Sequence, residues 1–447
     1  MSALTPFWKE IRATLVLALP IIFGQLLQNA LSVIDTMMVG QVSVEAVAAC
    51  SFASALFIVP LVFGFGVLGA LSVFIARAAA RHDREETVHL LRRGLVLSLG
   101  LSLLMVVAIT ALSHVLDWFH EPASVVALGQ PFLLLLTYSI VPMYLFQTLK
   151  QFCEAQHRAW PPLLILIGGV LLNIVLNWLF IYGHLGFPAM GLLGAGWATL
   201  LTRCAMFLLV AAYVAREFFP DALARQWLRQ RLPNFTGYAE LLRLGLPAGF
   251  QVILEVGAFT AAAIMMGWIS EAALAAHQVA ISVASTSFMV PLGLSMAVAI
   301  RVSHAMGKGL PTQARQAIHG SLLLTAGFMI TTAIVLFIFA RPLAALFIVD
   351  PSVVGLAAQV LVIAGLFQIF DGIQVVSFGA LRGLHDVKIP TLFNLFGYWA
   401  LGLPISYLIA FHFHGGATGI WWGLLAGLAF VAVCLVTRLE ILLRRQK

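Results

Sequence analysis

Four charged residues lie well inside apolar stretches of this sequence, namely Asp35, Arg203, Glu255 and Asp371. Even on the mildest scale, a charge at the centre of a bilayer costs about 2.5–3.5 kcal/mol. Each charge therefore needs a partner, a water-filled cavity or neutralisation by a proton. Ionisable residues inside a membrane usually mark ion or substrate pathways, so the three carboxylates are candidates for function. Arg203 could pair with a carboxylate or reach toward an interface, and no role is predicted for it.

Amide side chains accompany the carboxylates at spacings that place them on the same helix faces. Gln28 precedes Asp35 by about two turns. The matching combinations further along the chain are Gln251 with Glu255, Gln368 with Asp371, Asn173 with Asn177, and Gln278 with Ser282 and Ser285. These faces should point into a helix bundle, because contact with lipid would leave amides and carboxylates unsatisfied. For Ser282 and Ser285, a role in helix–helix contact is the preferred interpretation.

A carboxylate beside an amide in a membrane cavity can bind a proton, coordinate Na⁺ or pair with an organic cation. These three options compete for the same oxygen atoms. An antiporter needs such competition, because the inward-moving ion and the outward-moving cation can then displace each other.

The composition indicates an integral membrane protein of the all-α class. Of the 447 residues, 62% are hydrophobic and 10% are charged, whereas soluble domains carry about 25% charged residues. Apolar runs of at least 20 residues also argue against a β-barrel. Twelve membrane-spanning helices are predicted, at 13–37, 48–76, 91–113, 126–149, 160–183, 191–215, 240–268, 273–300, 317–340, 353–380, 389–412 and 417–441.

The basic residues predict the orientation of these spans. Of the 25 lysines and arginines, 23 fall on or near the same side of the membrane. Arg341 lies on the opposite side, and Arg203 falls within a span. The positive-inside rule then places both termini in the cytoplasm. A charged connection at 216–239 separates the first six spans from the last six. We therefore predict two domains, 1–232 and 233–447.

The two halves of the chain resemble each other. An offset of 227 residues pairs Pro20 with Pro247, and the same offset relates Phe23 to Phe250, Gly40 to Gly267 and Ser43 to Ser270. Internal repeats are typical of transporters. Because each half holds an even number of spans, both halves cross the membrane in the same direction, and a cavity is expected between them.

Other classes of protein find little support. The sequence has no P-loop and no protease or hydrolase motif, so neither ATP hydrolysis nor a membrane-embedded enzyme is expected. A channel is disfavoured because the twofold repeat indicates two moving halves. The scattered cysteines lack the spacing of a metal site, and no cofactor is expected. Asp350 stands before Pro351 as a good helix N-cap.

Several segments resemble the multidrug and toxic compound extrusion (MATE) transporters, and the likeness is greatest for their NorM-type branch. The segments are "QNALSVIDTMMVG" with Asp35, "LEVGAFTAAAIM" with Glu255, "LAAHQVAISVASTSFMVPLGLSMAVAIRVSHAMGKG", and "FDGIQVVSFGALRG" with Asp371. The resemblance implies two pseudo-symmetric six-helix lobes in a V shape, which alternate between inward-open and outward-open states. It also implies export of bulky, often cationic drugs in exchange for Na⁺ or H⁺.

The resemblance further implies roles for individual residues. Glu255 and Asp371 would form a cation site, with Na⁺ as one candidate ion, and Asp35 would be a titrating carboxylate. Polar residues of the cavity would be Gln28, Asn173, Asn177, Thr199 and Gln278, with Asp350 as a further acidic contact to substrate. The protein would be a monomer in the bacterial inner membrane, with small organic cations and lipid as its partners and no nucleic acid. A flippase for lipid-linked precursors is the alternative, but its anionic substrate would call for several cavity arginines.

Overall fold

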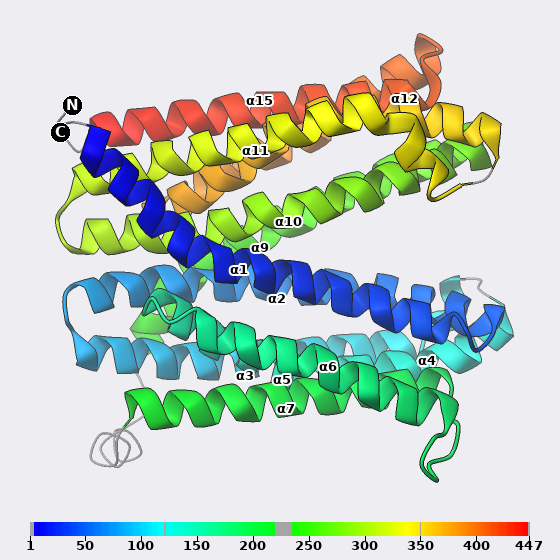
Figure 1. Cartoon of the computed structure of the whole chain (residues 1–447), viewed down its shortest axis with the longest axis horizontal. Coiled ribbons are helices and arrows are strands. Elements are labelled where there is room, and N and C mark those ends of the chain that lie inside the picture. Colours follow the sequence, from blue (N-terminus) through cyan, green and yellow to red (C-terminus); the bar gives the residue numbers. More distant parts are fainter. Residues whose placement is uncertain (1–3, 120–121, 220–234, 349, 446–447) are drawn as a thin grey trace. The chain divides into compact units, whose positions relative to one another are not determined.

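The structure, a computed structural model, describes the chain except for residues 1–3, 120–121, 220–234, 349 and 446–447. Every element in this described part is a helix (Figure 1). The first half holds α1 (Leu4–Val39), α2 (Val44–Ala80), α3 (Arg84–Ser113), η1 (Leu116–Phe119), α4 (Ala123–Tyr138), α5 (Ile140–Ala155), α6 (Trp160–Tyr182) and α7 (Leu192–Phe218). The second half holds α9 (Phe235–Ile269), α10 (Glu271–Gly307), α11 (Pro311–Ala345), α12 (Pro351–Gly383), α13 (Lys388–Leu395), η2 (Phe396–Gly402), α14 (Leu403–Tyr407), η3 (Leu408–His412) and α15 (Gly416–Arg444).

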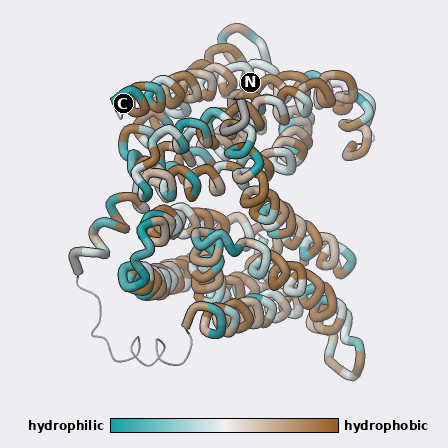
Figure 2. The backbone as a smooth tube through the Cα atoms, turned by 60° about the vertical axis from the view of Figure 1, so that its left-hand side comes forward, coloured by the Kyte–Doolittle hydropathy of each residue, from teal (hydrophilic) through white to brown (hydrophobic). Residues whose placement is uncertain are grey.

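Twelve helical segments within the described residues are long and apolar enough to cross a membrane, which confirms the predicted number. Figure 2 shows hydrophobic residues along the helices and hydrophilic residues gathered mainly at turns and helix ends. Two spans are not single regular helices. The fourth joins α4 and α5 at Ser139, and the eleventh contains the π-helical stretches η2 and η3.

The chain packs into two compact units. We call Leu26–Gly249 the central unit, and Met1–Gln25 together with Phe250–Lys447 the terminal unit. The helices α1 and α9 each contribute residues to both units. The predicted domain boundary between residues 232 and 233 lies outside the described residues, so that division stays a prediction.

The internal repeat is visible in how helices begin and pack. Ser43 and Ser270, related by the 227-residue offset, both cap a helix by accepting a hydrogen bond from the backbone N–H three residues later, at 3.0 and 3.1 Å. Gly66 of α2 lies so close to α9 that an added Cβ would be 2.7 Å from the Cα of Gly249. Its equivalent in the terminal unit, Gly293 of α10, would meet the Cα of Ile22 in α1 at 2.7 Å. Glycine at these two positions thus lets neighbouring helix backbones touch.

Each unit has its own buried core. In the central unit, Tyr144 of α5 is fully buried, and its hydroxyl donates to the carbonyl oxygen of Pro60 in α2 at 2.6 Å. In the terminal unit, aromatic rings from four helices pack against one another, with Phe367 in contact with Phe259 and Trp421, and Phe259 in contact with Tyr398. The carboxylates singled out in the sequence lie within or beside these cores.

Candidate functional sites: a caged carboxylate and an acid pair

Asp35, on α1 in the central unit, is held by neutral hydrogen-bond donors. The Asn177 side-chain amide donates to its Oδ1 at 2.6 Å, and the Thr199 hydroxyl donates to its Oδ2 at 3.3 Å. Asn177 also donates to Oδ1 of Asn173 at 3.0 Å. Asn173, Asn177 and Thr199 are all buried, and they come from α6 and α7. The structure therefore brings three of the expected cavity residues, Asn173, Asn177 and Thr199, together around Asp35.

Arg203 belongs to the surroundings of Asp35, although the sequence suggested no role for it. The two side chains attract each other electrostatically. The guanidinium donates to the hydroxyl of Ser139 at 2.6 Å, and its central carbon lies 5.3 Å from the centre of the Phe57 ring. Ser139 is the residue at which the fourth span breaks between α4 and α5. Arg203 thus has a fixed place in the central unit, and its charge offsets that of Asp35.

Glu255 and Asp371 come together in the terminal unit. Glu255 lies on α9, and Asp371 lies on α12 with 6% of its surface exposed. The two side chains interact electrostatically with each other, and both interact with Tyr398. Neither carboxylate accepts a hydrogen bond from another described residue. Two like charges in one buried place repel each other, so a proton or a cation stabilises the arrangement.

A chain of hydrogen bonds runs beside the acid pair. The Tyr398 hydroxyl donates to Oε1 of Gln374 at 3.3 Å, and Nε2 of Gln374 donates to Oδ1 of Asn394 at 3.3 Å. Nδ2 of Asn394 in turn donates to the carbonyl oxygen of Gln251 at 3.2 Å. The three side chains are buried and connect α12, the eleventh span and α9. This network fixes the backbone one turn before Glu255.

Sequence reasoning missed these three network residues, although a signal for them exists. Gln374 follows Asp371 by three residues and continues the Gln368–Asp371 face. Asn394 and Tyr398 lie one turn apart in the eleventh span, the same spacing as Gln251 and Glu255. Gln368 is fully buried, and neither atom of its amide group has a hydrogen-bond partner among the described residues.

The other predicted cavity residues are not connected to either carboxylate site by a hydrogen bond in the described part of the chain. Gln278 is exposed on α10, and Gln28 keeps a buried amide nitrogen without a partner. Ser282 and Ser285 donate to carbonyl oxygens of their own helix, at 2.8 and 3.1 Å, rather than to a neighbouring helix.

Asp350 is the helix N-cap that the sequence predicts. It accepts hydrogen bonds from the Ser352 hydroxyl at 2.7 Å and from the Ser352 backbone N–H at 2.9 Å. These bonds hold the pKa of Asp350 below its usual value. Its place in the structure is therefore explained by capping of α12.

A further buried ion pair was missed because the fourth span was predicted to end at residue 149. The helix α5 continues to Ala155, and Lys150 and Glu154 are each 2% exposed with Nζ 3.1 Å from Oε1. Gln147 and Gln151 lie on the same face of α5 and are equally buried. Besides Asp35, the central unit thus contains a fully buried acid, Glu154, that is paired with its own cation.

Among the described residues, no three or more His, Cys, Asp or Glu side chains are grouped to hold a metal ion. A Na⁺ ion between Glu255 and Asp371 would need neutral oxygen ligands in addition to the two carboxylates. The amide oxygen of Gln368, which lies one turn from Asp371 and has no hydrogen-bond partner among the described residues, is a neutral oxygen of this kind. The residues present are therefore compatible with Na⁺ or with a shared proton.

The twelve spans, the internal repeat and the buried carboxylates define a multi-pass membrane transporter. Comparison with known families agrees, because the MatE model matches residues 20–179 and again 247–408, once in each half of the chain. The chain belongs to the MatE family. Members of this family are transporters, so the expectation that the protein is not an enzyme is confirmed.

Individual relatives cover nearly the whole chain. The "Probable multidrug resistance protein NorM" of Mesorhizobium japonicum is 40% identical over 96% of this chain and 94% of its own length. The protein of the same name from Bradyrhizobium diazoefficiens is 35% identical over 98% of this chain and 94% of its own length. An outward-facing multidrug resistance MATE family transporter of the MOP superfamily has a TM-score of 0.90 at 19% identity, covering 98% of this chain and 97% of that one. That likeness confirms the fold.

Proposed function

We propose that the chain is a secondary active multidrug efflux transporter that exports bulky, often cationic compounds in exchange for inward Na⁺ or H⁺. The observation that carries the proposal is the pair of carboxylates in the terminal unit, in which the buried Asp371 and the half-buried Glu255 interact electrostatically. The family of the chain and the names of its NorM relatives support multidrug export.

The chemistry of the acid pair accounts for coupling between ion and drug. Two adjacent carboxylates without hydrogen-bond donors repel each other, and a bound Na⁺ or proton removes that repulsion. An organic cation can do the same. Because the ion and the drug relieve the same repulsion, each lowers the affinity for the other, and the coupling is reciprocal.

Asp35 supplies a second carboxylate with a different environment. Its oxygens are already bound by Asn177 and Thr199, and Arg203 offsets its charge. We assign Asp35 to the drug-translocation step, as a titrating group whose proton state changes during alternating access. Coupling-ion binding itself is assigned to Glu255 and Asp371.

The proposal includes the orientation and setting of the protein. The positive-inside rule places both termini in the cytoplasm of a bacterial cell, with the protein in the inner membrane. Each unit has its own closed aromatic or aliphatic core, so a monomer is proposed as the working form.

The decisive experiment is transport in proteoliposomes with Na⁺ and H⁺ gradients imposed separately. We expect efflux of a cationic dye to follow one of the two gradients and to stop in Glu255→Gln and in Asp371→Asn. Asp83→Asn is the matched control, because it also neutralises an acid but at the exposed N-cap of α3, and it should transport normally. If the rate of dye movement depends on neither gradient, or if Glu255→Gln keeps full efflux, the proposal is wrong.

A further inference from the structure

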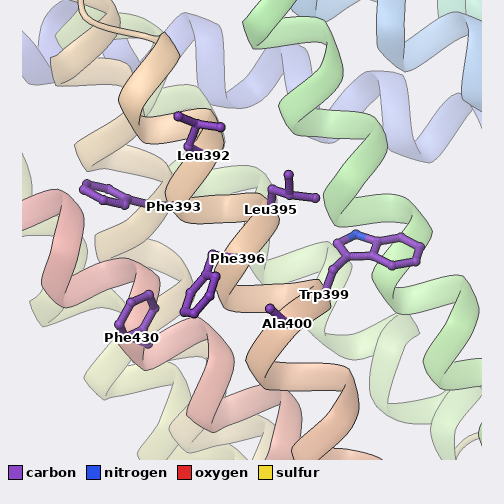
Figure 3. A pocket seen from close by; sticks show the side chains of 7 residues that line it. All are labelled: Leu392, Phe393, Leu395, Phe396, Trp399, Ala400 and Phe430. Carbon is purple, nitrogen blue, oxygen red and sulfur yellow. The ribbon is translucent and has the colours of Figure 1, made fainter.

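An apolar groove lies on the terminal unit. It has a volume of about 670 Å³ and is lined by Leu392, Phe393, Leu395, Phe396, Trp399, Ala400 and Phe430. Six of these residues belong to the eleventh span and one belongs to α15 (Figure 3). Every lining side chain is apolar apart from the indole N–H of Trp399. The transport mechanism described above makes no use of this groove.

Close packing of two helix backbones creates the groove. A Cβ on Gly397 would be 2.1 Å from the side chain of Val431, and one on Gly427 would be 2.4 Å from the carbonyl oxygen of Gly397. The π-helical turn of η2 places Phe396 beside Phe430, with ring centres 5.7 Å apart. The glycines therefore bring the backbones of α15 and η2 into contact beside the large side chains that line the groove.

The side chains of the groove are too exposed for a closed core. Leu392, Phe396 and Trp399 keep 61%, 50% and 42% of their surface exposed. Because they lie within a candidate membrane span, exposed apolar side chains of this kind meet acyl chains. Lipid is thus the molecule that surrounds the groove.

Both walls of the groove end in a basic residue at the same end. Lys388 begins α13 and lies on the helix face of Leu392, Leu395 and Trp399, at intervals of about one turn. Arg444 ends α15, on the face that carries Phe430. A hydrogen bond of 2.7 Å between Arg438 and Asp386 holds the start of α13 beside the last turns of α15. Lys388 and Arg444 are both exposed. Lys388 forms no ion pair with a described residue, whereas Arg444 attracts Glu440 one turn earlier in α15.

We propose that this groove is a binding site for one anionic phospholipid of the adjacent leaflet. The phosphate pairs with Lys388 and Arg444, and one acyl chain lies in the groove against Phe396, Trp399 and Phe430. By the positive-inside rule this leaflet is the cytoplasmic one, where anionic lipids attract basic residues by about 1 kcal/mol each.

The bound acyl chain touches a residue that contacts the acid-bearing helix. The indole N–H of Trp399 donates to the carbonyl oxygen of Leu254 at 3.0 Å, directly before Glu255 in α9. A Cβ on Gly257, just after Glu255, would be 3.1 Å from the same indole ring. A lipid that packs on Trp399 therefore holds the backbone on both sides of Glu255. This consequence rests on the proposed function of Glu255, whereas lipid binding itself does not.

The test compares binding of dioleoyl-phosphatidylglycerol and dioleoyl-phosphatidylcholine to the purified protein by native mass spectrometry. The two lipids carry the same acyl chains and differ in headgroup charge. We expect one tightly retained phosphatidylglycerol molecule on the unaltered protein. Lys388→Gln should weaken its retention by about fivefold, the equivalent of about 1 kcal/mol, and leave phosphatidylcholine unaffected. Ala400→Trp should fill the groove and remove retention of both lipids.

Two matched variants complete the design. Lys308→Gln removes a lysine at the end of α10, also in the terminal unit, and Leu323→Trp adds an indole at an exposed apolar position of α11. Both should bind lipid as the unaltered protein does. Equal retention in Lys388→Gln and the unaltered protein, or an equal loss in Lys308→Gln, would overturn the proposal. So would displacement of the lipid by a cationic dye, because the groove would then be a substrate site. The assay needs no ion gradient, so its outcome is independent of transport.

Discussion

The two carboxylate sites solve the problem of a buried acid in different ways. In the central unit, Asp35 receives hydrogen bonds at 2.6 and 3.3 Å from neutral donors and has Arg203 nearby. In the terminal unit, Glu255 and Asp371 repel each other electrostatically, and the neighbouring polar groups form hydrogen bonds among themselves instead. The protein itself thus supplies Asp35 with hydrogen bonds and a nearby positive charge. The carboxylates of the second site accept no hydrogen bond from another described residue, and in the proposed mechanism a cation or a proton relieves their repulsion.

The internal repeat sharpens this contrast. The 227-residue offset relates Glu255 to Gln28, and it relates Asp35 to Ala262. Each half of the chain therefore carries an acid where the other half has a neutral residue. The acids of the two halves thus stand at positions that the repeat does not relate, which is consistent with the proposed separation of ion binding from translocation.

The largest expected effect concerns ion binding by the purified protein. Glu255→Gln installs the residue type that the other half has at this position, and we expect it to reduce binding of radiolabelled Na⁺, or drug-induced proton release, to background. Asp371→Asn should do the same. The remaining carboxylate, Glu255, then has no second negative charge beside it, so a bound cation or proton relieves no repulsion. Asp35→Asn should keep ion binding while losing drug export. Equal loss of ion binding in all three variants would remove the division of tasks between the units.

The next largest effect concerns the acid that carries its own cation. Lys150→Met leaves Glu154 buried without a partner, which should lower the free energy of unfolding by about 3–5 kcal/mol. The double variant Lys150→Met with Glu154→Leu should recover most of that loss. Denaturant unfolding in detergent micelles measures both, with the exposed Lys308→Met as control. If Lys150→Met and Lys308→Met are equally stable, the ion pair contributes nothing.

A smaller effect is expected from the network beside the acid pair. Tyr398→Phe removes the hydroxyl that donates to Gln374, a hydrogen bond worth about 1 kcal/mol. The ion concentration for half-maximal export should change by about fivefold, with the maximal rate largely kept. Thr199→Val removes a comparable hydroxyl from Asp35 and should leave that ion concentration unchanged. A shift of the same size in Thr199→Val would show that the network is not specific to ion binding.

The spans and the candidate acids could be predicted because a membrane restricts the structures and residue types that can cross it. Every span must be apolar and helical, so all twelve were recognisable, and Asp35, Glu255 and Asp371 stood out as costly exceptions. Lys150 and Glu154 escaped notice because they follow the last strongly apolar residues of their span. Tyr398 and Asn394 escaped because Tyr and Asn also occur in spans for ordinary packing, and periodicity alone does not show which helix they face.

The sequence by itself determined the twelve spans, the twofold repeat, the acids within the spans and the family. Hydropathy and motif spacing depend only on residues that are close together along the chain. Tertiary structure decided the partners. It placed Arg203 beside Asp35, joined Glu255 to Asp371 across residues far apart in the chain, and formed the lipid groove where Gly397 meets α15. Partner choice depends on how helices pack, and packing is set by side-chain shape across helices rather than by the pattern along any one of them.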